Sequence, residues 1–170
     1  LGHTLDVETL RGESLTMARS AFLRATCNVF VASAQSWLDA GLWETLTTDI
    51  ELGSGGVLAV DQSLNQDRVV GLRAKKIDDE TIVEVAFVEA TLAGAWSRIE
   101  KLMESDAALQ LAIGAGLEIQ LPAKLKSRTT TVGHREMTKW TAIVRQMIKE
   151  NRVKHHGELL LNEHVARAVP

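Results

Sequence analysis

A single carboxylate follows a short apolar run in the first half of the chain. Residues 57–60 read Val-Leu-Ala-Val, and Asp61 comes next, before polar residues. A carboxylate beside a buried strand is costly unless a cation or hydrogen bonds meet it. Carboxylate oxygens are also the ligands that Mg²⁺ and Mn²⁺ prefer. Asp61 is therefore the first candidate for a metal ligand. The competing interpretation is a strand-end aspartate that caps the next turn.

Two further acids are candidates for the same site. Hydrolysis of a phosphodiester with two Mg²⁺ or Mn²⁺ ions needs several carboxylates from separate elements. Glu89 closes the third predicted strand, which runs in the same direction as the first in a meander, so it is expected at the same edge as Asp61. Glu118 lies near the start of a predicted strand. The alternative for both is a solvated strand residue.

Hydrophobic periodicity predicts the elements that position these acids. Strands are expected at 57–61, 68–76 and 81–88, joined by short links that imply an antiparallel meander. The rest alternates helices with short strands. We predict a mixed α/β sheet with helices on both faces. The remaining predicted elements are a helix at 92–104, strands at 117–121 and 129–132, a helix at 134–150, a short strand at 153–155 and a helix at 158–169. Residues 106–113 could either extend the first of these helices or form a separate turn.

The amino-terminal part has a different pattern. Residues 1–12 are predicted to be irregular, and helices are expected at 13–31 and 35–46. The glycine-rich stretch 49–56 is interpreted as a hinge. We therefore divide the chain into a helical arm at 1–48 and a main domain at 49–170.

Composition excludes several classes of protein. With 170 residues the chain is long enough for one domain with a core. No apolar run approaches the roughly 20 residues that cross a bilayer. Cys27 is the only cysteine, which excludes an intrachain disulfide and a cysteine zinc site. His155, His156 and His164 lack the spacing of zinc ligands. No nucleotide-binding P-loop pattern occurs.

The charges are unevenly distributed. Residues 123–157 hold nine basic and two acidic side chains, a balance of +7, which leaves −10 for the rest of a chain whose total is −3. A basic segment on an acidic body predicts a local contact with a polyanion. Trp140 is expected on the apolar face of its helix, so base stacking is not predicted. The candidate DNA-binding residues are Lys124, Lys126, Arg128, Arg135, Lys139, Arg145 and Lys149; the alternative is a solvated helix face.

Three stretches together resemble the carboxyl-terminal nuclease portion of bacteriophage large terminases of the actinobacterial tailed-phage type. One is the arm with Ala21-Phe22-Leu23-Arg24, Asn28, Trp37 and Trp43. Another is Val57 to Asp61. The third is Thr131 to Met137, followed by Arg152 to His155 and Glu163 to Val165.

The resemblance implies a ribonuclease H-like endonuclease domain that cleaves concatemeric viral DNA. It implies that Asp61 is the first metal ligand, that two Mg²⁺ or Mn²⁺ ions bind, and that an ATPase region precedes the arm. The family's last acid would lie beyond Pro170, so the nuclease domain is expected to be incomplete at its carboxyl end. Implied partners are double-stranded DNA and, in the full-length protein, the portal and the small terminase subunit, in the host cytoplasm.

Two alternatives remain open. In the family the second acid commonly ends the fourth strand, and the predicted strand 117–121 carries none at its end. This favours a nuclease-inactive module that binds DNA or docks within the packaging machine. Another ribonuclease H-like nuclease, such as a junction resolvase, would prefer four-way junctions to linear duplex.

Overall fold

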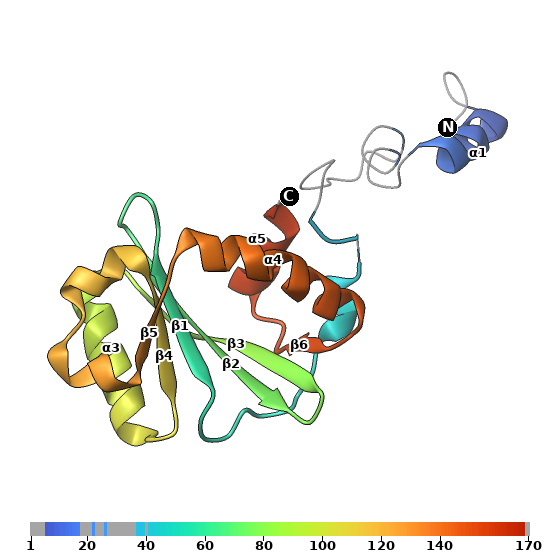
Figure 1. Cartoon of the computed structure of the whole chain (residues 1–170). Helices are drawn as coiled ribbons and strands as arrows, with labels where there is room; N and C mark the ends of the chain where they lie inside the picture. Colours follow the sequence, from blue (N-terminus) through green and yellow to red (C-terminus); the bar gives the residue numbers. More distant parts are fainter. Residues whose placement is uncertain (1–5, 18–21, 23–25, 27–36, 40, 169–170) are drawn as a thin grey trace.

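The computed structural model describes residues 6–17, 22, 26, 37–39 and 41–168. A six-stranded sheet with the order β5-β4-β1-β2-β3-β6 forms its centre (Figure 1). The first three strands make the predicted antiparallel meander, β4 and β5 run parallel to β1, and β6 runs parallel to β3. The predicted mixed sheet is confirmed. The strands are β1 (Val57–Gln62), β2 (Val69–Ile77), β3 (Glu80–Glu89), β4 (Gln110–Gly114), β5 (Thr129–Val132) and β6 (Val153–His155).

Helix α3 (Leu92–Ser105) covers one face of the sheet. Its first turn is capped by Thr91, whose hydroxyl accepts a hydrogen bond from the Gly94 N–H at 3.1 Å. Its buried stripe packs on alternate residues of the strands, as amphipathic periodicity predicts. The resulting main core contains Leu58, Val60, Val69, Phe87, Ala95, Ile99, Met103, Leu111 and Ile113, among others.

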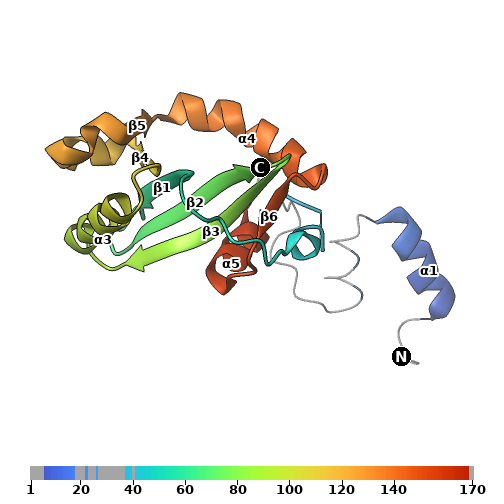
Figure 2. The ribbon, with the colours of Figure 1, turned by 90° about the horizontal axis from the view of Figure 1, so that it is seen from below.

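Helix α4 (His134–Lys149) lies on the opposite side of the sheet from α3 (Figure 2). A second core forms at its carboxyl end, where Ile148 packs with Val153 of β6 and with the 3₁₀ turn η1 (Trp43–Leu46). Helix α5 (Leu159–Arg167) contributes Leu161 to the same core. Helices therefore lie on both faces of the sheet. None of the described helices is long and apolar enough to cross a membrane.

The fourth strand is not where the sequence pattern placed it. The strand predicted at 117–121 is wrong, because this stretch lies in the 3₁₀ turn η2 (Ala115–Gln120). The actual β4 lies in 110–114, where Leu111 and Ile113 alternate into the core. Apolar and polar residues alternate at 117–121, but the apolar ones do not form a buried side, since only Leu117 of η2 is buried. A third 3₁₀ turn, η3 (Ala123–Arg128), then leads to β5.

The amino-terminal predictions are partly wrong. An α-helix, α1 (Val7–Thr16), occupies part of the stretch predicted to be irregular, and Asp6 caps it by accepting the Thr9 N–H at 2.7 Å. The helix ends at Thr16, inside the helix predicted over 13–31. Most of residues 18–31 lie outside the described residues.

In the described part of the helix predicted over 35–46, one short helical turn is present. Residues 37–39 form a bend, and η1 is the helical part of the rest. Residues 35, 36 and 40 lie outside the described ranges. A polar contact explains the observed geometry: the Trp43 indole N–H donates to the Asn162 side-chain oxygen at 2.9 Å, which ties η1 to α5. Tertiary packing thus overrides the helical periodicity here.

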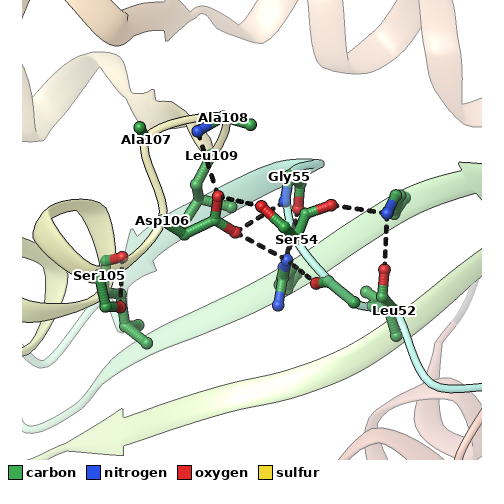
Figure 3. A network of polar contacts seen from close by, with 12 residues as sticks. Leu52, Ser54, Gly55, Ser105, Asp106, Ala107, Ala108 and Leu109 are labelled. Carbon is green, nitrogen blue, oxygen red and sulfur yellow. Dashed lines mark hydrogen bonds and ion pairs between the residues drawn. The ribbon is translucent and has the colours of Figure 1, made fainter.

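The glycine-rich stretch interpreted as a hinge is held by charged side chains (Figure 3). Asp106, just after α3, accepts hydrogen bonds from the Ser54 hydroxyl and the Gly55 N–H, both at 2.7 Å. The Arg73 guanidinium pairs with the same carboxylate at 3.1 Å. Lys75 donates to the Leu52 and Ser54 carbonyl oxygens at 2.7 and 2.6 Å. We call this network the linker clamp.

Candidate metal and nucleic-acid site

Asp61 is the penultimate residue of β1 and is exposed. Leu58 and Val60 point into the main core below α3, and because strand side chains alternate, Asp61 points to the other face. That is the face on which α4 lies (Figure 2). Its Oδ1 accepts the Gln62 N–H at 2.9 Å. The carboxylate is therefore available on the α4 face of the sheet.

Gly114 ends β4 directly beside Asp61. Val60 pairs with Ile113 in the parallel register of β1 and β4, which brings the next residues of both strands together. A Cβ built on Gly114 would lie 2.7 Å from the Asp61 Oδ1. The strand end that could supply a second acid thus carries a glycine, and its lack of a side chain makes room for the Asp61 carboxylate. The sequence pattern does not point to Gly114, because the strand that it predicts at 117–121 lies beyond β4.

The structure does not bring Glu89 to Asp61. Glu89 pairs with Val69, and Val69 is buried in the main core. Paired residues point to the same face of a sheet, so Glu89 points to the α3 side. Its Oε2 lies 3.1 Å from the position of a Cβ on Gly94, in the first turn of α3. Glu89 and Asp61 therefore lie on opposite faces.

Glu118 lies on the same rim as Asp61. The strands β1 and β4 are parallel, so their carboxyl ends meet at one edge, and Glu118 is an exposed residue of η2 just after β4. Within the part of the chain that the structure describes, no three His, Cys, Asp or Glu side chains are close enough to form a metal-binding group. Among the described residues, Asp61 is thus not part of a ready-made group of three ligands.

Two of the predicted DNA-binding residues, Arg128 and Lys124, contact α3 and the loop that follows it. Arg128 donates to the carbonyl oxygens of Met103, Asp106, Ala107 and Leu109, which satisfies the carboxyl end of α3 and the following loop. Lys124 pairs with Glu100 at 3.1 Å and Glu104 at 3.2 Å. These hydrogen bonds, that of Glu100 first, raise the pKa of Lys124. Both basic groups stabilise α3 from the loop that precedes β5.

The basic residues of α4 differ in their surroundings. Arg135 and Lys139 are exposed in its first half. Lys149, at its end, lies 3.7 Å from the Asp39 carboxylate. Arg145 lines a hollow of about 530 Å³ with Trp37, Thr138, Thr141 and Ala142. Lys126 is an exposed residue of η3. Three of the predicted DNA-binding residues thus make the fewest interactions with other described residues: Arg135, Lys139 and Lys126.

The apolar face expected for α4 is only partly buried. Ile148 is its one buried residue, whereas Met137 is 54% and Trp140 51% exposed. The Lys139 Nζ lies 5.4 Å from the centroid of the Trp140 ring, within the range of a cation–π contact. Trp140 is therefore half exposed and lies close to Lys139, although it shares the apolar stripe of the helix with Met137. An aromatic ring does accompany the cations of α4.

Of the three histidines considered as zinc ligands, His155 has a packing role. His155 of β6 is buried and stacks on Trp43, with ring centroids 4.1 Å apart. Its Nε2 lies 2.9 Å from the Trp43 carbonyl oxygen, and its Nδ1 accepts the Gly157 N–H at 3.0 Å. Both ring nitrogens are thus occupied by backbone groups. This arrangement fixes η1 on the edge of the sheet.

Comparison with known proteins identifies one relevant fold. No protein-family model matches the sequence, and no curated protein matches it significantly. Among solved structures, the chain is similar to the large terminase of the thermophilic bacteriophage D6E, with a TM-score of 0.56 over 97% of this chain and 7% sequence identity. The chain spans 45% of the length of that terminase. The mixed sheet and its helices thus form a ribonuclease H-like, terminase-like fold, as predicted.

Proposed function

We propose that this chain is the nuclease part of a phage DNA-packaging terminase and cleaves double-stranded viral DNA in a reaction that depends on Mg²⁺ or Mn²⁺. One observation carries the proposal: Asp61 lies near the carboxyl end of β1, a central strand of a terminase-like sheet, on the face that also carries the exposed cations of α4. This function entails two protein partners, the portal and the small terminase subunit. It also entails a location in the host cytoplasm.

The residues around Asp61 fit one hard cation better than two. The carboxylate is exposed, and Glu118 is an exposed acid of η2, which follows β4 at the same rim. In this proposal Asp61 is the principal ligand and Glu118 a second one, whereas Glu89 is not used because it faces α3. When bound, the ion would supply charge stabilisation for phosphodiester hydrolysis. The role of this chain is to place the ion beside the basic surface that binds the DNA backbone.

The DNA contact rests on Arg135 and Lys139. Both belong to the first half of α4, which follows β5, and β5 ends on the same rim as β1 and β4. Contacts of this kind bind phosphate without reading sequence and weaken steeply with salt. They suit an enzyme that cuts long DNA with little sequence preference.

A second function is favoured by Gly114. A glycine at the end of β4 removes the position from which a second acid would reach Asp61. A nuclease-inactive module that binds DNA within the packaging machine would need only the basic surface. This alternative shares the DNA contact and lacks cleavage.

An assay of plasmid DNA cleavage in the presence of Mn²⁺ distinguishes the nuclease from the nuclease-inactive module. Full-length wild type, with the complete carboxyl end of the nuclease domain, is expected to nick the plasmid, and Asp61→Asn in the same protein is expected to lose cleavage but keep DNA binding. Asp79→Asn is the matched control, because Asp79 is an exposed acid at the β2–β3 turn, at the opposite end of the sheet. If wild type binds DNA but never cuts, the nuclease-inactive module is correct. A preference for four-way junctions in competition would indicate a resolvase instead.

A further inference from the structure

Three segments meet at the rim that carries Asp61. The strands β1, β4 and β5 are mutually parallel, so the chain leaves all three at the same edge of the sheet (Figure 1). The segments that follow are the loop 63–68, the turn η2 and the first turn of α4. The turn η2 packs against β4 and β5, and the loop leads to β2 on the other side of β1. Asp61 therefore lies between η2 and the loop.

Each of these two segments presents one fully exposed aliphatic side chain. Leu64 in the loop is 102% exposed and Ile119 in η2 is 95% exposed. They are the two most exposed large apolar side chains of the described residues. Single exposed apolar residues are ordinary, but these two flank one candidate metal ligand. The rim therefore has one exposed apolar side chain on each side of the Asp61 carboxylate.

The loop that carries Leu64 is held by its own hydrogen bonds. The Ser63 N–H donates to the Arg68 carbonyl oxygen, and the Gln66 N–H donates to the Ser63 carbonyl oxygen, both at 2.9 Å. The Ser63 hydroxyl donates to the Asp67 carboxylate at 2.6 Å and accepts the Arg68 N–H at 3.2 Å. Leu64 is thus presented by a pre-organised loop, which lowers the entropy cost of inserting it into a partner.

We propose that Leu64 and Ile119 enter the minor groove of duplex DNA on either side of the phosphate that Asp61 faces. This inference rests on the proposed function. Aliphatic side chains that enter the minor groove open base steps and bend the duplex. The exposed cations Arg135 and Lys139 on the same rim favour a polyanion as the partner. A docked protein would be expected to cover a continuous apolar patch, whereas the acids Asp61 and Glu118 interrupt this one.

The test uses the full chain and a duplex without a special sequence, with Ca²⁺ present. Leu64→Asn and Ile119→Asn are each expected to weaken binding about three- to tenfold, as measured by fluorescence anisotropy at several salt concentrations. The slope of log K against log salt should stay unchanged, because neither side chain contacts a phosphate. Arg135→Gln should instead reduce that slope by about 0.9. A 2-aminopurine duplex should brighten on binding wild type and not on binding Leu64→Asn.

Leu159→Asn is the matched control, because Leu159 is a 73% exposed leucine on α5. All three substitutions are at exposed sites, and equal thermal unfolding temperatures would confirm intact folds. The inference is overturned if Leu64→Asn and Ile119→Asn bind DNA as the control does while wild type still binds and cleaves. If wild type does not bind duplex at all, the proposed function fails together with the inference.

Discussion

The Asp61 carboxylate occupies the space that a side chain on Gly114 would need. The two residues end neighbouring parallel strands, and a Cβ at Gly114 would lie 2.7 Å from the Asp61 Oδ1. The backbone of Gly114 is ordinary for any residue, with φ −61° and ψ 146°. Glycine at this position thus leaves space for the Asp61 carboxylate and is not required by the backbone conformation.

Gly114→Ala is therefore expected to displace the Asp61 carboxylate with little effect on folding. Because the contacted atom is the end of a side chain and the backbone suits alanine, the free energy of unfolding should stay within about 1 kcal/mol of wild type. Mn²⁺ affinity, measured by calorimetric titration, and plasmid cleavage should both fall. Gly116→Ala is the control, since a Cβ there meets nothing within 4 Å. Equal loss in both variants would contradict the role given to Gly114.

Asp106→Asn is expected to change how stability depends on pH. The backbone hydrogen bond from Gly55, followed by that from the Ser54 side chain, lowers the pKa of Asp106 below its ordinary value. A lowered folded-state pKa contributes stability that is present above the unfolded pKa and is lost as pH falls through the folded value. The difference in unfolding free energy between wild type and Asp106→Asn should thus be constant near neutral pH and shrink below about pH 4.

Chemical denaturation at a series of pH values measures this difference. Asp78→Asn serves as the control, because Asp78 is exposed and outside the linker clamp. A difference between wild type and Asp106→Asn that persists unchanged to the lowest pH would show that the charge of Asp106 does not stabilise the clamp.

Arg128→Met is expected to lower the stability of the protein by about 1–3 kcal/mol. The guanidinium donates to four carbonyl oxygens at the end of α3 and in the following loop, and its loss leaves partly buried acceptors without partners. Lys126→Met, two residues earlier and exposed, should leave the unfolding free energy unchanged. Thermal and urea unfolding of both variants make the comparison. A larger cost for Lys126→Met would contradict this assignment.

His155→Ala is expected to cost about 2–4 kcal/mol, because it removes a buried ring together with its stack on Trp43 and two hydrogen bonds. His164→Ala, at an exposed position of α5, should change stability by less than about 0.5 kcal/mol. The near-ultraviolet circular dichroism of Trp43 should weaken only in His155→Ala. Equal unfolding midpoints for the two variants would rule out this packing role.

Periodicity in the sequence was sufficient for most of the fold. The meander, α3, β5, α4, β6 and α5 all follow patterns that local residue type determines. The fourth strand was missed because Gln110–Gly114 is short and follows a helix closely, while the alternation at 117–121 resembled a strand. Only the parallel pairing with β1 distinguishes the two stretches.

The candidate site was less predictable, because its members are defined by register and tertiary contact. Asp61 follows from local sequence alone. The face on which Glu89 lies depends on its pairing with Val69, which no local pattern reveals. Arg128 resembled any other basic residue of its segment, and its role follows from carbonyl groups about 20 positions earlier. Leu64 was not singled out, since isolated leucines are common in loops.

The contact of η1 with β6 has a consequence for shortened forms of this protein. Thr47 bridges to His155 and the Thr48 N–H donates to the His155 carbonyl oxygen at 2.9 Å, so this segment shields the outer edge of the sheet. A version of the protein that starts at residue 49 would expose that edge and the hollow left by Trp43. Open strand edges beside apolar surface recruit other chains, so such a version would be prone to self-association.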